Sequence, residues 1–216
     1  MPGCGIQGVG KDKKCVTDTQ AFFEADLQLM GVAAADLMLI HFPPSGGCGA
    51  LGCKSIQAQW KVFEDMYAAG KARAIGVSNY CESCLKCLSE TMTVKPMVNQ
   101  VKLHVGMGAD PTGLVSYCAA QNITVQAYSP LGDGSDELIT GPLVSGIAKA
   151  HGKASGATVS LKWLNQNGIP IVTKASDPTY LAEDFDLFGW QLTDAEMDQL
   201  NKATSPSGAP SFSCSS

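Results

Sequence analysis

The alternation of short apolar runs with amphipathic stretches constrains the fold of this chain more than any other feature. Five runs of strand length recur along the sequence, at residues 36–42, 72–79, 97–103, 123–129 and 169–175. Each is apolar almost without interruption, which is typical of strands buried on both faces of a parallel sheet. Between them, helical spacing of apolar residues predicts helices that include 17–31, 55–70, 155–168 and 193–203. Strand–helix alternation therefore predicts an α/β fold with right-handed crossovers.

Polar side chains gather where the apolar runs end. His41 closes the first run, Ser78 and Asn79 close the second, and the other ends carry Gln100, Tyr128, Ser129 and Lys174. The carboxyl edge of a parallel sheet binds ligands both in open doubly wound sheets and in (β/α)8 barrels. No G-x-G-x-x-G turn follows any of the runs, so the barrel is favoured over a dinucleotide-binding open sheet.

Charge and hydropathy exclude several classes of partner. The net charge is −5 and no basic patch stands out, so nucleic acid is not expected as a partner. No apolar run approaches the roughly 20 residues of a membrane span, so no membrane association is expected. The N-terminus lacks the pattern of a signal or transit peptide. The nine cysteines are then expected to be reduced thiols in a cytoplasmic protein.

A set of ordered motifs resembles the aldo-keto reductase family. The motifs are DLMLIHFP, KARAIGVSNY, MVNQVKLHVG, QAYSPLG and VTKASDPTYLAEDF, and the likeness runs from about residue 17 to about residue 203. The resemblance implies a (β/α)8 barrel of TIM type that reduces aldehydes and ketones with NADPH and without a metal. The five runs would then be strands four to eight of an incomplete barrel. We expect a partial barrel domain over 1–204 and a disordered tail, rich in Ser, Gly and Pro, over 205–216.

The resemblance also implies a role for individual residues. His41 matches the catalytic histidine that orients and polarises the substrate carbonyl. Ser78, Asn79 and Gln100 match the groups that bind the nicotinamide carboxamide, and Tyr128 matches the aromatic that stacks on the nicotinamide ring. The remaining implied cofactor contacts are Ser129 and Leu131 at the pyrophosphate, Lys174 at the ribose phosphate and Glu183 on the adenine side.

Two departures from the family pattern affect function. The family takes an Asp, a Tyr acid and a Lys from earlier strands, whereas no tyrosine precedes His41 here. A chain that lacks these groups, and the first three strands, is expected to be inactive as it stands and to self-associate through open sheet edges. In addition, Tyr180 and Asp184 occupy positions where the family often has an Arg and an Asn near the NADPH 2′-phosphate, so NADH is an alternative cofactor.

Three functions remain open from the sequence. The first is NAD(P)H-dependent reduction of a small aldehyde or ketone to an alcohol. The second is a non-catalytic, nucleotide-binding regulatory module that has lost its acid. The third is a thiol redox protein, because Cys81 and Cys84 form a C-x-x-C pair near a predicted helix start. For Cys81, Cys84 and Cys87, a zinc site completed by Cys48 or Cys53 and simple packing of small residues are the alternatives.

Overall fold

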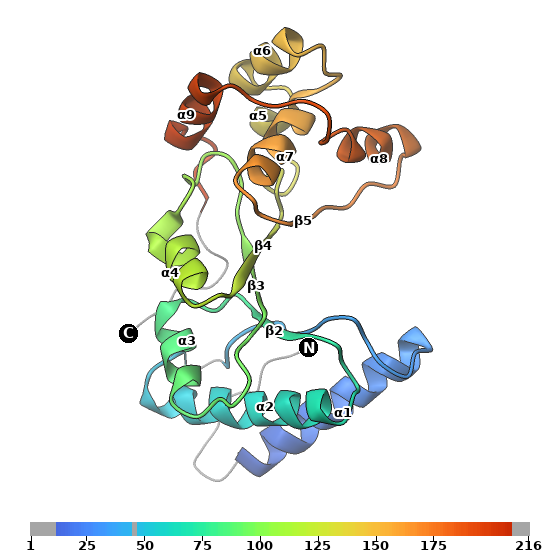
Figure 1. Cartoon of the computed structure of the whole chain (residues 1–216), viewed down its shortest axis with the longest axis vertical. Helices are drawn as coiled ribbons and strands as arrows, with labels where there is room; N and C mark the ends of the chain where they lie inside the picture. The colour runs from blue at the N-terminus through green and yellow to red at the C-terminus, as the bar shows by residue number, and fades with distance from the viewer. Residues whose placement is uncertain (1–11, 45–46, 209–216) are drawn as a thin grey trace. The chain divides into compact units, whose positions relative to one another are not determined.

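A parallel five-stranded sheet forms the centre of the fold. The computed structural model describes residues 12–44 and 47–208, and the account that follows concerns those residues. The strands follow one another in the sheet in chain order: β1 (Met38–Ile40), β2 (Ile75–Ser78), β3 (Val98–Lys102), β4 (Thr124–Tyr128) and β5 (Ile171–Val172). Each falls within one of the five predicted runs (Figure 1). The predicted α/β fold with parallel strands is confirmed.

The chain divides into two compact units. The first comprises the described residues up to Gln100 together with 117–124, and the second comprises 101–116 together with the described residues from 125 onward. Strands β3 and β4 and helix α4 (Leu114–Ala120) each begin in one unit and end in the other.

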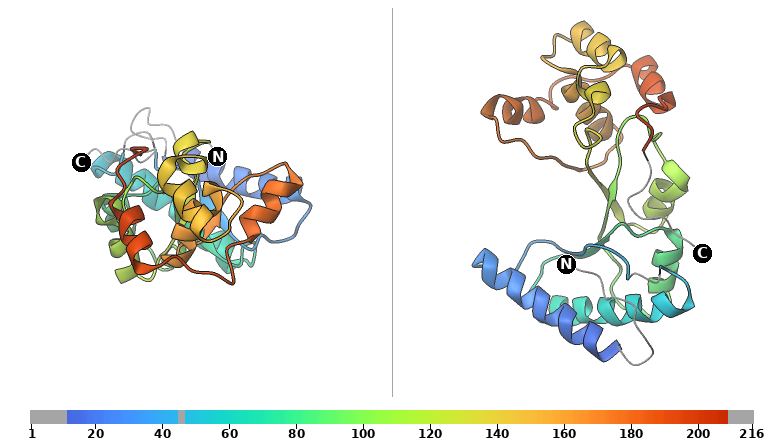
Figure 2. Two further views of the ribbon diagram at one scale, coloured as in Figure 1. Left: turned by 90° about the horizontal axis from the view of Figure 1, so that it is seen from above. Right: turned by 180° about the vertical axis from the view of Figure 1, so that it is seen from behind.

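Helices α1 (Asp12–Met30), α2 (Ala50–Ala68) and α3 (Glu82–Ser89) form the helical part of the first unit. Figures 1 and 2 show α1 crossing α2 obliquely, and α2 also packs against α3. Phe23 of α1 meets Phe63 of α2 edge-on, with 5.2 Å between ring centroids. Trp60 is fully buried and donates its indole N–H to the carbonyl of Val94 at 2.9 Å. Apolar contacts thus hold α1 against α2, and α2 in turn contacts β2.

Two buried polar side chains link the loops of the first unit to its core. The Glu64 carboxylate accepts hydrogen bonds from the backbone N–H groups of Thr93 and Val94, at 2.5 and 2.8 Å. The buried Asn99 amide donates to the Tyr80 carbonyl at 2.7 Å, and its oxygen accepts from the Tyr80 N–H at 3.4 Å. These bonds satisfy backbone groups outside the strand ladder, which would otherwise be costly to bury.

The second unit contains η1 (Pro111–Gly113), α5 (Asp136–Ile139), α6 (Pro142–Ala150), α7 (Gly156–Gln166), α8 (Pro178–Phe185) and α9 (Asp194–Lys202). Helix α7 packs against α5, α6 and α8 (Figure 2). Its Trp163 is fully buried and donates to the Asn201 side chain of α9 at 2.8 Å. A capping box between Thr193 and Glu196 begins α9.

Helix boundaries differ from the prediction at two N-termini. Helix α1 begins at Asp12 rather than Thr17, and α2 begins at Ala50 rather than Ser55. The predicted ends hold, because Gly31 and Gly70 adopt positive φ values of 67° and 71° just beyond the two helices. The N-cap of α2 is Gly49, which has no side chain that could accept a hydrogen bond from the first turn.

Burial of the strands is uneven. All four residues of β2 are buried, as predicted for a strand covered on both faces. Strand β5 is only partly covered, with Val172 40% exposed, which differs from that prediction. Strand β5 pairs with β4, and within residues 12–44 and 47–208 no strand pairs with its other edge, so water reaches it.

Some predictions fall partly outside the described residues. These are residues 1–11 of the predicted barrel domain and residues 209–216 of the predicted tail. Within the described part, Ser205 donates its hydroxyl hydrogen to Glu137 at 2.6 Å. None of the described helices has the length and apolar character that crossing a membrane requires.

Candidate active site

The first unit brings four predicted site residues to one sheet edge. Ser78 ends β2 and pairs in register with Gln100 of β3, and Asn79 follows immediately. Asn79 donates its side-chain N–H groups to the His41 carbonyl at 2.9 Å and to the Ser78 hydroxyl at 3.0 Å. Ser78 donates its hydroxyl hydrogen to the Gln100 carbonyl at 2.8 Å, and the Asn79 backbone N–H donates to the same carbonyl at 2.9 Å. His41, Ser78, Asn79 and Gln100 therefore form one hydrogen-bonded cluster across the ends of three strands.

His41 presents an exposed imidazole just beyond β1. Its ring packs at a tilt against Phe42, with 4.4 Å between centroids. Desolvation by the neighbouring protein lowers the pKa of His41 below its ordinary value. This shift favours the neutral imidazole, in which one ring nitrogen is a hydrogen-bond donor and the other an acceptor.

Asn79 holds a left-handed backbone conformation at this edge, with φ of 62°. Asparagine tolerates this region better than most residues, because its short polar side chain bonds locally. Ser78 and Asn79 are only 2% and 7% exposed, so their positions are fixed by the core beneath them. The turn after β2 thus directs the chain into α3 while keeping two polar side chains at the strand end.

The second unit carries the remaining predicted residues. Tyr128 ends β4, pairs in register with Val172 of β5 and is half-buried. Ser129 follows with a positive φ of 49°, and its carbonyl accepts a hydrogen bond from the Gly132 N–H at 2.9 Å. Leu131 is half-buried in this tight turn. The turn places Ser129 and Leu131 directly after the aromatic side chain.

Lys102 and Asp133 hold this turn, and neither was predicted from the sequence. The Lys102 ammonium and the Asp133 carboxylate form an ion pair at 2.7 Å. Lys102, followed by the Ser129 hydroxyl, holds the pKa of Asp133 below its ordinary value. Gln100 and Lys102 are two residues apart in the sequence, so their side chains lie on one face of β3. This spacing could have indicated that Lys102 lies near the predicted site.

Lys174 and Glu183 lie beyond β5. Lys174 is exposed in the loop that leads to α8, and Glu183 is on α8 itself. The Glu183 carboxylate accepts a 2.6 Å hydrogen bond from the Ser155 hydroxyl. Tyr180 and Asp184 stand four residues apart on the same helix, and Tyr180 is 61% exposed. Burial, with a smaller effect from Glu183, raises the pKa of Asp184.

Two histidines to which the sequence assigned no role have structural partners. His104 is buried, and its Nδ1 lies 2.7 Å from the Val105 carbonyl, to which it must donate. Burial lowers the pKa of His104 below its ordinary value. His151 contacts both carboxylate oxygens of Glu196, at 3.0 and 2.9 Å, and packs against Trp190. These contacts account for both side chains without a catalytic role.

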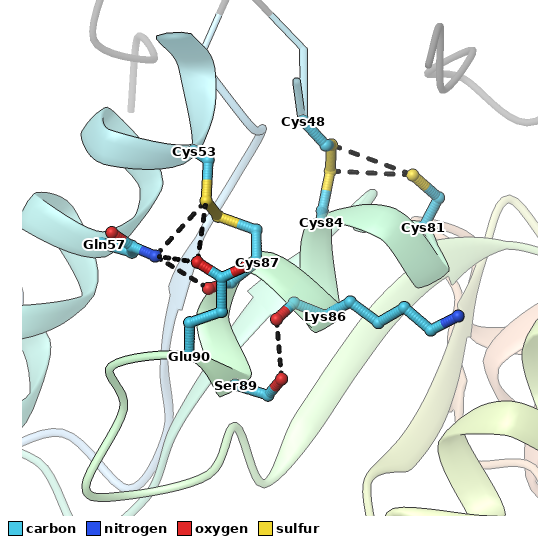
Figure 3. Close-up of a disulfide and its surroundings, with 9 residues drawn as sticks. All are labelled: Cys48, Cys53, Gln57, Cys81, Cys84, Lys86, Cys87, Ser89 and Glu90. Carbon is cyan, nitrogen blue, oxygen red and sulfur yellow. Dashed lines mark hydrogen bonds between the residues drawn. A yellow bond between two sulfur atoms is a disulfide. The ribbon is translucent and has the colours of Figure 1, made fainter. Parts of the chain in front are cut away.

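The cysteines depart from the expectation of reduced thiols. Disulfides join Cys48 to Cys84 and Cys53 to Cys87, linking α2 and the segment before it to α3 (Figure 3). Cys84 is therefore bonded to Cys48 rather than to Cys81, its neighbour in the C-x-x-C pair. The Cys81 sulfur lies 3.6 Å from that of Cys84 and 3.9 Å from that of Cys48. Sequence spacing alone could not show that Cys48 lies beside this pair.

Comparison with known proteins identifies the family. Residues 8–205 match the model of the aldo/keto reductase family. The chain is 34% identical over 199 residues to aldose reductase B of Dictyostelium discoideum, an alignment that covers 84% of this chain and 63% of that protein. This protein belongs to the aldo/keto reductase family.

Solved structures give the same result. An aldo-keto reductase from a Medee basin deep-sea metagenome library, MGS-M4, superposes with a TM-score of 0.79 at 30% identity, covering 88% of this chain and 67% of that one. A Gox0644 variant in complex with NADPH gives a TM-score of 0.76 at 26% identity, covering 91% and 68%. The five strands thus match part of an aldo-keto reductase barrel. The chain spans about 63% of the length of the curated relative named above.

Proposed function

We propose that this chain provides the cofactor-binding and histidine-bearing part of an NAD(P)H-dependent oxidoreductase that reduces a small aldehyde or ketone to an alcohol. The observation that carries the proposal is the hydrogen-bonded cluster of His41, Ser78, Asn79 and Gln100 at the carboxyl edge of three neighbouring strands. Family membership supports the reaction class, and the NADPH complex of Gox0644 supports the cofactor.

The residues present fit a nicotinamide cofactor. The Asn79 amide, whose two N–H groups donate to His41 and Ser78 within the cluster, is proposed to lie beside the carboxamide of the cofactor. The Gln100 side chain is the second amide at this edge, and Tyr128 offers a flat ring for stacking. Bound NADPH supplies the hydride. Ser129, Leu131, Lys174 and Glu183 are proposed to contact the rest of the cofactor.

His41 is proposed to orient the substrate. Its neutral imidazole donates a hydrogen bond to the carbonyl oxygen, which stabilises the negative charge that develops there during hydride transfer. The alkoxide also requires a proton, and a general acid typically contributes 10²- to 10⁴-fold to such a rate. The tyrosine that serves as the acid in the family has no counterpart before His41 in these 216 residues. We therefore propose that the 216-residue chain binds cofactor without significant turnover.

The proposal also covers the substrate class, the location and the partners of this protein. A small carbonyl compound is the proposed substrate, with neither nucleic acid nor a membrane as partner. The cytoplasm is the proposed location, where the disulfides joining Cys48 to Cys84 and Cys53 to Cys87 would be reduced. The net charge of −5 agrees with the absence of a nucleic-acid role. The specific carbonyl substrate depends on loops that vary within a barrel scaffold, so the proposal is limited to the class.

Replacing Tyr128 with alanine is expected to weaken NADPH binding by at least about fivefold. Stacking of a base on an aromatic side chain is worth about 1–3 kcal/mol, and the nicotinamide ring presents a comparable face. The measurement is titration of the reduced cofactor's fluorescence with the purified chain. Tyr67→Ala on α2 is the control, since Tyr67 lies outside the proposed site.

An equal affinity of the wild-type and Tyr128→Ala chains would contradict the proposed cofactor site. Binding that depends on Tyr128, in a completed barrel that shows no turnover with any reactive aldehyde, would instead identify a non-catalytic nucleotide-binding module. The first result tests the cofactor site, and the second tests the proposed reaction.

The isolated chain is expected to self-associate through β1 and β5. Among the described residues each of these strands pairs on one side only, and unpaired parallel edges promote association. Beside β5 lies an apolar groove of about 540 Å³ whose lining includes Leu181, Phe185 and Phe188. Light scattering at micromolar concentration is expected to detect oligomers.

A charged residue on the edge strand should reduce this association. Val172→Lys places an ammonium group on β5. Val32→Lys is the control, because Val32 lies in the first unit outside the strands and is 43% exposed, close to the 40% of Val172. We expect the Val172 variant alone to shift the chain towards monomers. A compact wild-type monomer at micromolar concentration would show that the unpaired edges of β1 and β5 do not promote association.

A further inference from the structure

A disulfide that joins α2 to α3 lies beside a pocket in the first unit. Cys53 of α2 is bonded to Cys87 of α3 (Figure 3). The pocket has a volume of about 450 Å³, and both cysteines line it together with Gln57, Lys86 and Glu90. Small-molecule sites have volumes of about 300–1,000 Å³, so the pocket is large enough for a ligand. The proposed reductase chemistry uses neither cysteine.

The two bonded cysteines differ in exposure. Cys53 is half-buried, whereas Cys87 is buried, with only 4% of its surface exposed. Leu85 and Leu88, which flank Cys87 on α3, are buried as well. A small molecule from solvent therefore reaches the Cys53 sulfur directly, while reaction at Cys87 requires local opening of α3.

An amide donor stands beside the Cys53 sulfur. The Gln57 side-chain nitrogen, one turn further along α2, lies 3.3 Å from that sulfur, and an N–H donor there stabilises negative charge on it. The same nitrogen donates to the Cys87 carbonyl at 3.0 Å and to the Glu90 carboxylate at 3.1 Å, contacts that hold it in place whether or not the disulfide is formed. One Glu90 carboxylate oxygen lies 4.0 Å from the Cys53 sulfur and opposes a negative charge there.

We propose that Cys53 and Cys87, when reduced, form a redox pair that reacts with a low-molecular-weight disulfide, with Cys53 as the attacking thiolate and Cys87 as the resolving thiol. The Cys53 thiolate attacks one sulfur of the small disulfide, whose S–S bond breaks, so that a mixed disulfide forms on Cys53 and one small thiolate leaves. The deprotonated Cys87 then attacks the Cys53 sulfur, the Cys53–Cys87 bond forms, and the second small thiolate leaves. The two cysteines lose two electrons and two protons, and the small disulfide gains them as two thiols.

The pocket accommodates the small thiol that the mixed disulfide carries. Besides the residues named above, its lining includes Lys54 and Ser83, two exposed polar side chains that suit the carboxylates and amides of a peptide thiol. Closure of the disulfide ties α2 to α3, the helix that follows the Asn79 turn of the candidate site. The redox state of the pair therefore determines whether α3 is held covalently.

The test follows the reaction of the full 216-residue chain with glutathione disulfide. The chain is reduced with a water-soluble phosphine, freed of it and mixed with the probe under anaerobic conditions. Samples are quenched with acid and N-ethylmaleimide, and peptide mass spectrometry locates the adducts. Trypsin cleaves after Lys54 and Lys86, so Cys53 and Cys87 fall on different peptides. We expect the wild type to form the Cys53–Cys87 disulfide through a glutathione adduct on Cys53, a result that needs no variant.

Cysteine variants assign the two roles. Cys87→Ser is expected to accumulate the glutathione adduct on Cys53, because the resolving thiol is absent. In Cys53→Ser, the adduct on Cys87 should form more slowly by about tenfold or more, because a buried thiol reacts only after local opening. Equal rates at Cys53 and Cys87 in these two variants, or a reduced wild type that does not form the Cys53–Cys87 disulfide, would overturn the proposal.

Two further substitutions in the Cys87→Ser background separate the electrostatic effects from loss of packing. Gln57→Ala should slow the reaction at Cys53 by about two- to tenfold, the effect of one hydrogen bond, whereas Glu90→Gln should accelerate it. Gln20→Ala on α1 is the control and should leave the rate unchanged, since Gln20 contacts Glu24 and not the pocket. Acceleration by both Gln57→Ala and Glu90→Gln would indicate simple exposure of the sulfur and contradict the proposed role of Gln57. None of these measurements uses NADPH, so they do not bear on the proposed reductase function.

Discussion

Joining this chain to the first third of a full-length relative is expected to raise NADPH-dependent aldehyde reduction by about 10²- to 10⁴-fold or more. The factor is what a general acid typically contributes, and in this family the acid comes from strands that precede His41. No tyrosine occurs before His41 in the 216 residues, so the chain alone has no counterpart of that acid. The measurement is NADPH consumption with a reactive aldehyde, on the chain alone and on the joined protein.

His41→Ala is the matched control in both proteins. In the joined protein it should lower the rate, because the exposed imidazole is the proposed donor to the substrate carbonyl. In the chain alone it should change little, since little turnover is expected. Robust turnover by the chain alone that disappears in His41→Ala would contradict the requirement for the missing acid.

The sequence predicted the sheet and the proximity of His41, Ser78 and Gln100 because both depend on local patterns. Each apolar run became a parallel strand, and strands in parallel register bring their carboxyl ends to one edge. That rule alone places His41, Ser78 and Gln100 near one another, and the structure adds the Asn79 hydrogen bonds that join them.

Other features could not be predicted, because they depend on contacts between distant segments. The Lys102–Asp133 ion pair joins β3 to a turn 31 residues later, and neither residue stands out in its own segment. The disulfide between Cys48 and Cys84 spans 36 residues. Six cysteines already allow 15 disulfide pairings, and this chain has nine cysteines. The C-x-x-C spacing drew attention to Cys81 and Cys84, while the bonded partner of Cys84 came from the segment before α2.

Replacing Tyr180 with arginine is expected to tighten NADPH binding to the joined protein selectively, by about tenfold or more. A hydrogen bond to a charged group is worth about 1.5–3 kcal/mol, which corresponds to roughly 10- to 150-fold in affinity. The resemblance to the family implies an Arg at this position that holds the 2′-phosphate. Tyr180 supplies no positive charge there. Tyr180 is 61% exposed, so the longer side chain can be accommodated without repacking the core. NADH lacks the 2′-phosphate, and its affinity should not change.

The unmodified joined protein should accordingly discriminate only weakly between the two cofactors. Asp184 lies one turn from Tyr180, and its carboxylate disfavours a phosphate when it is ionised. Lys174 is the cation that this chain offers for the ribose phosphate, but it acts as a point charge without the bidentate geometry of Arg. Phe188→Arg is the control, because it adds the same charge at a side chain 70% exposed and beyond α8. A native preference for NADPH above about a hundredfold, unchanged in Tyr180→Arg, would mean that other groups hold the phosphate and that α8 does not bear on cofactor choice.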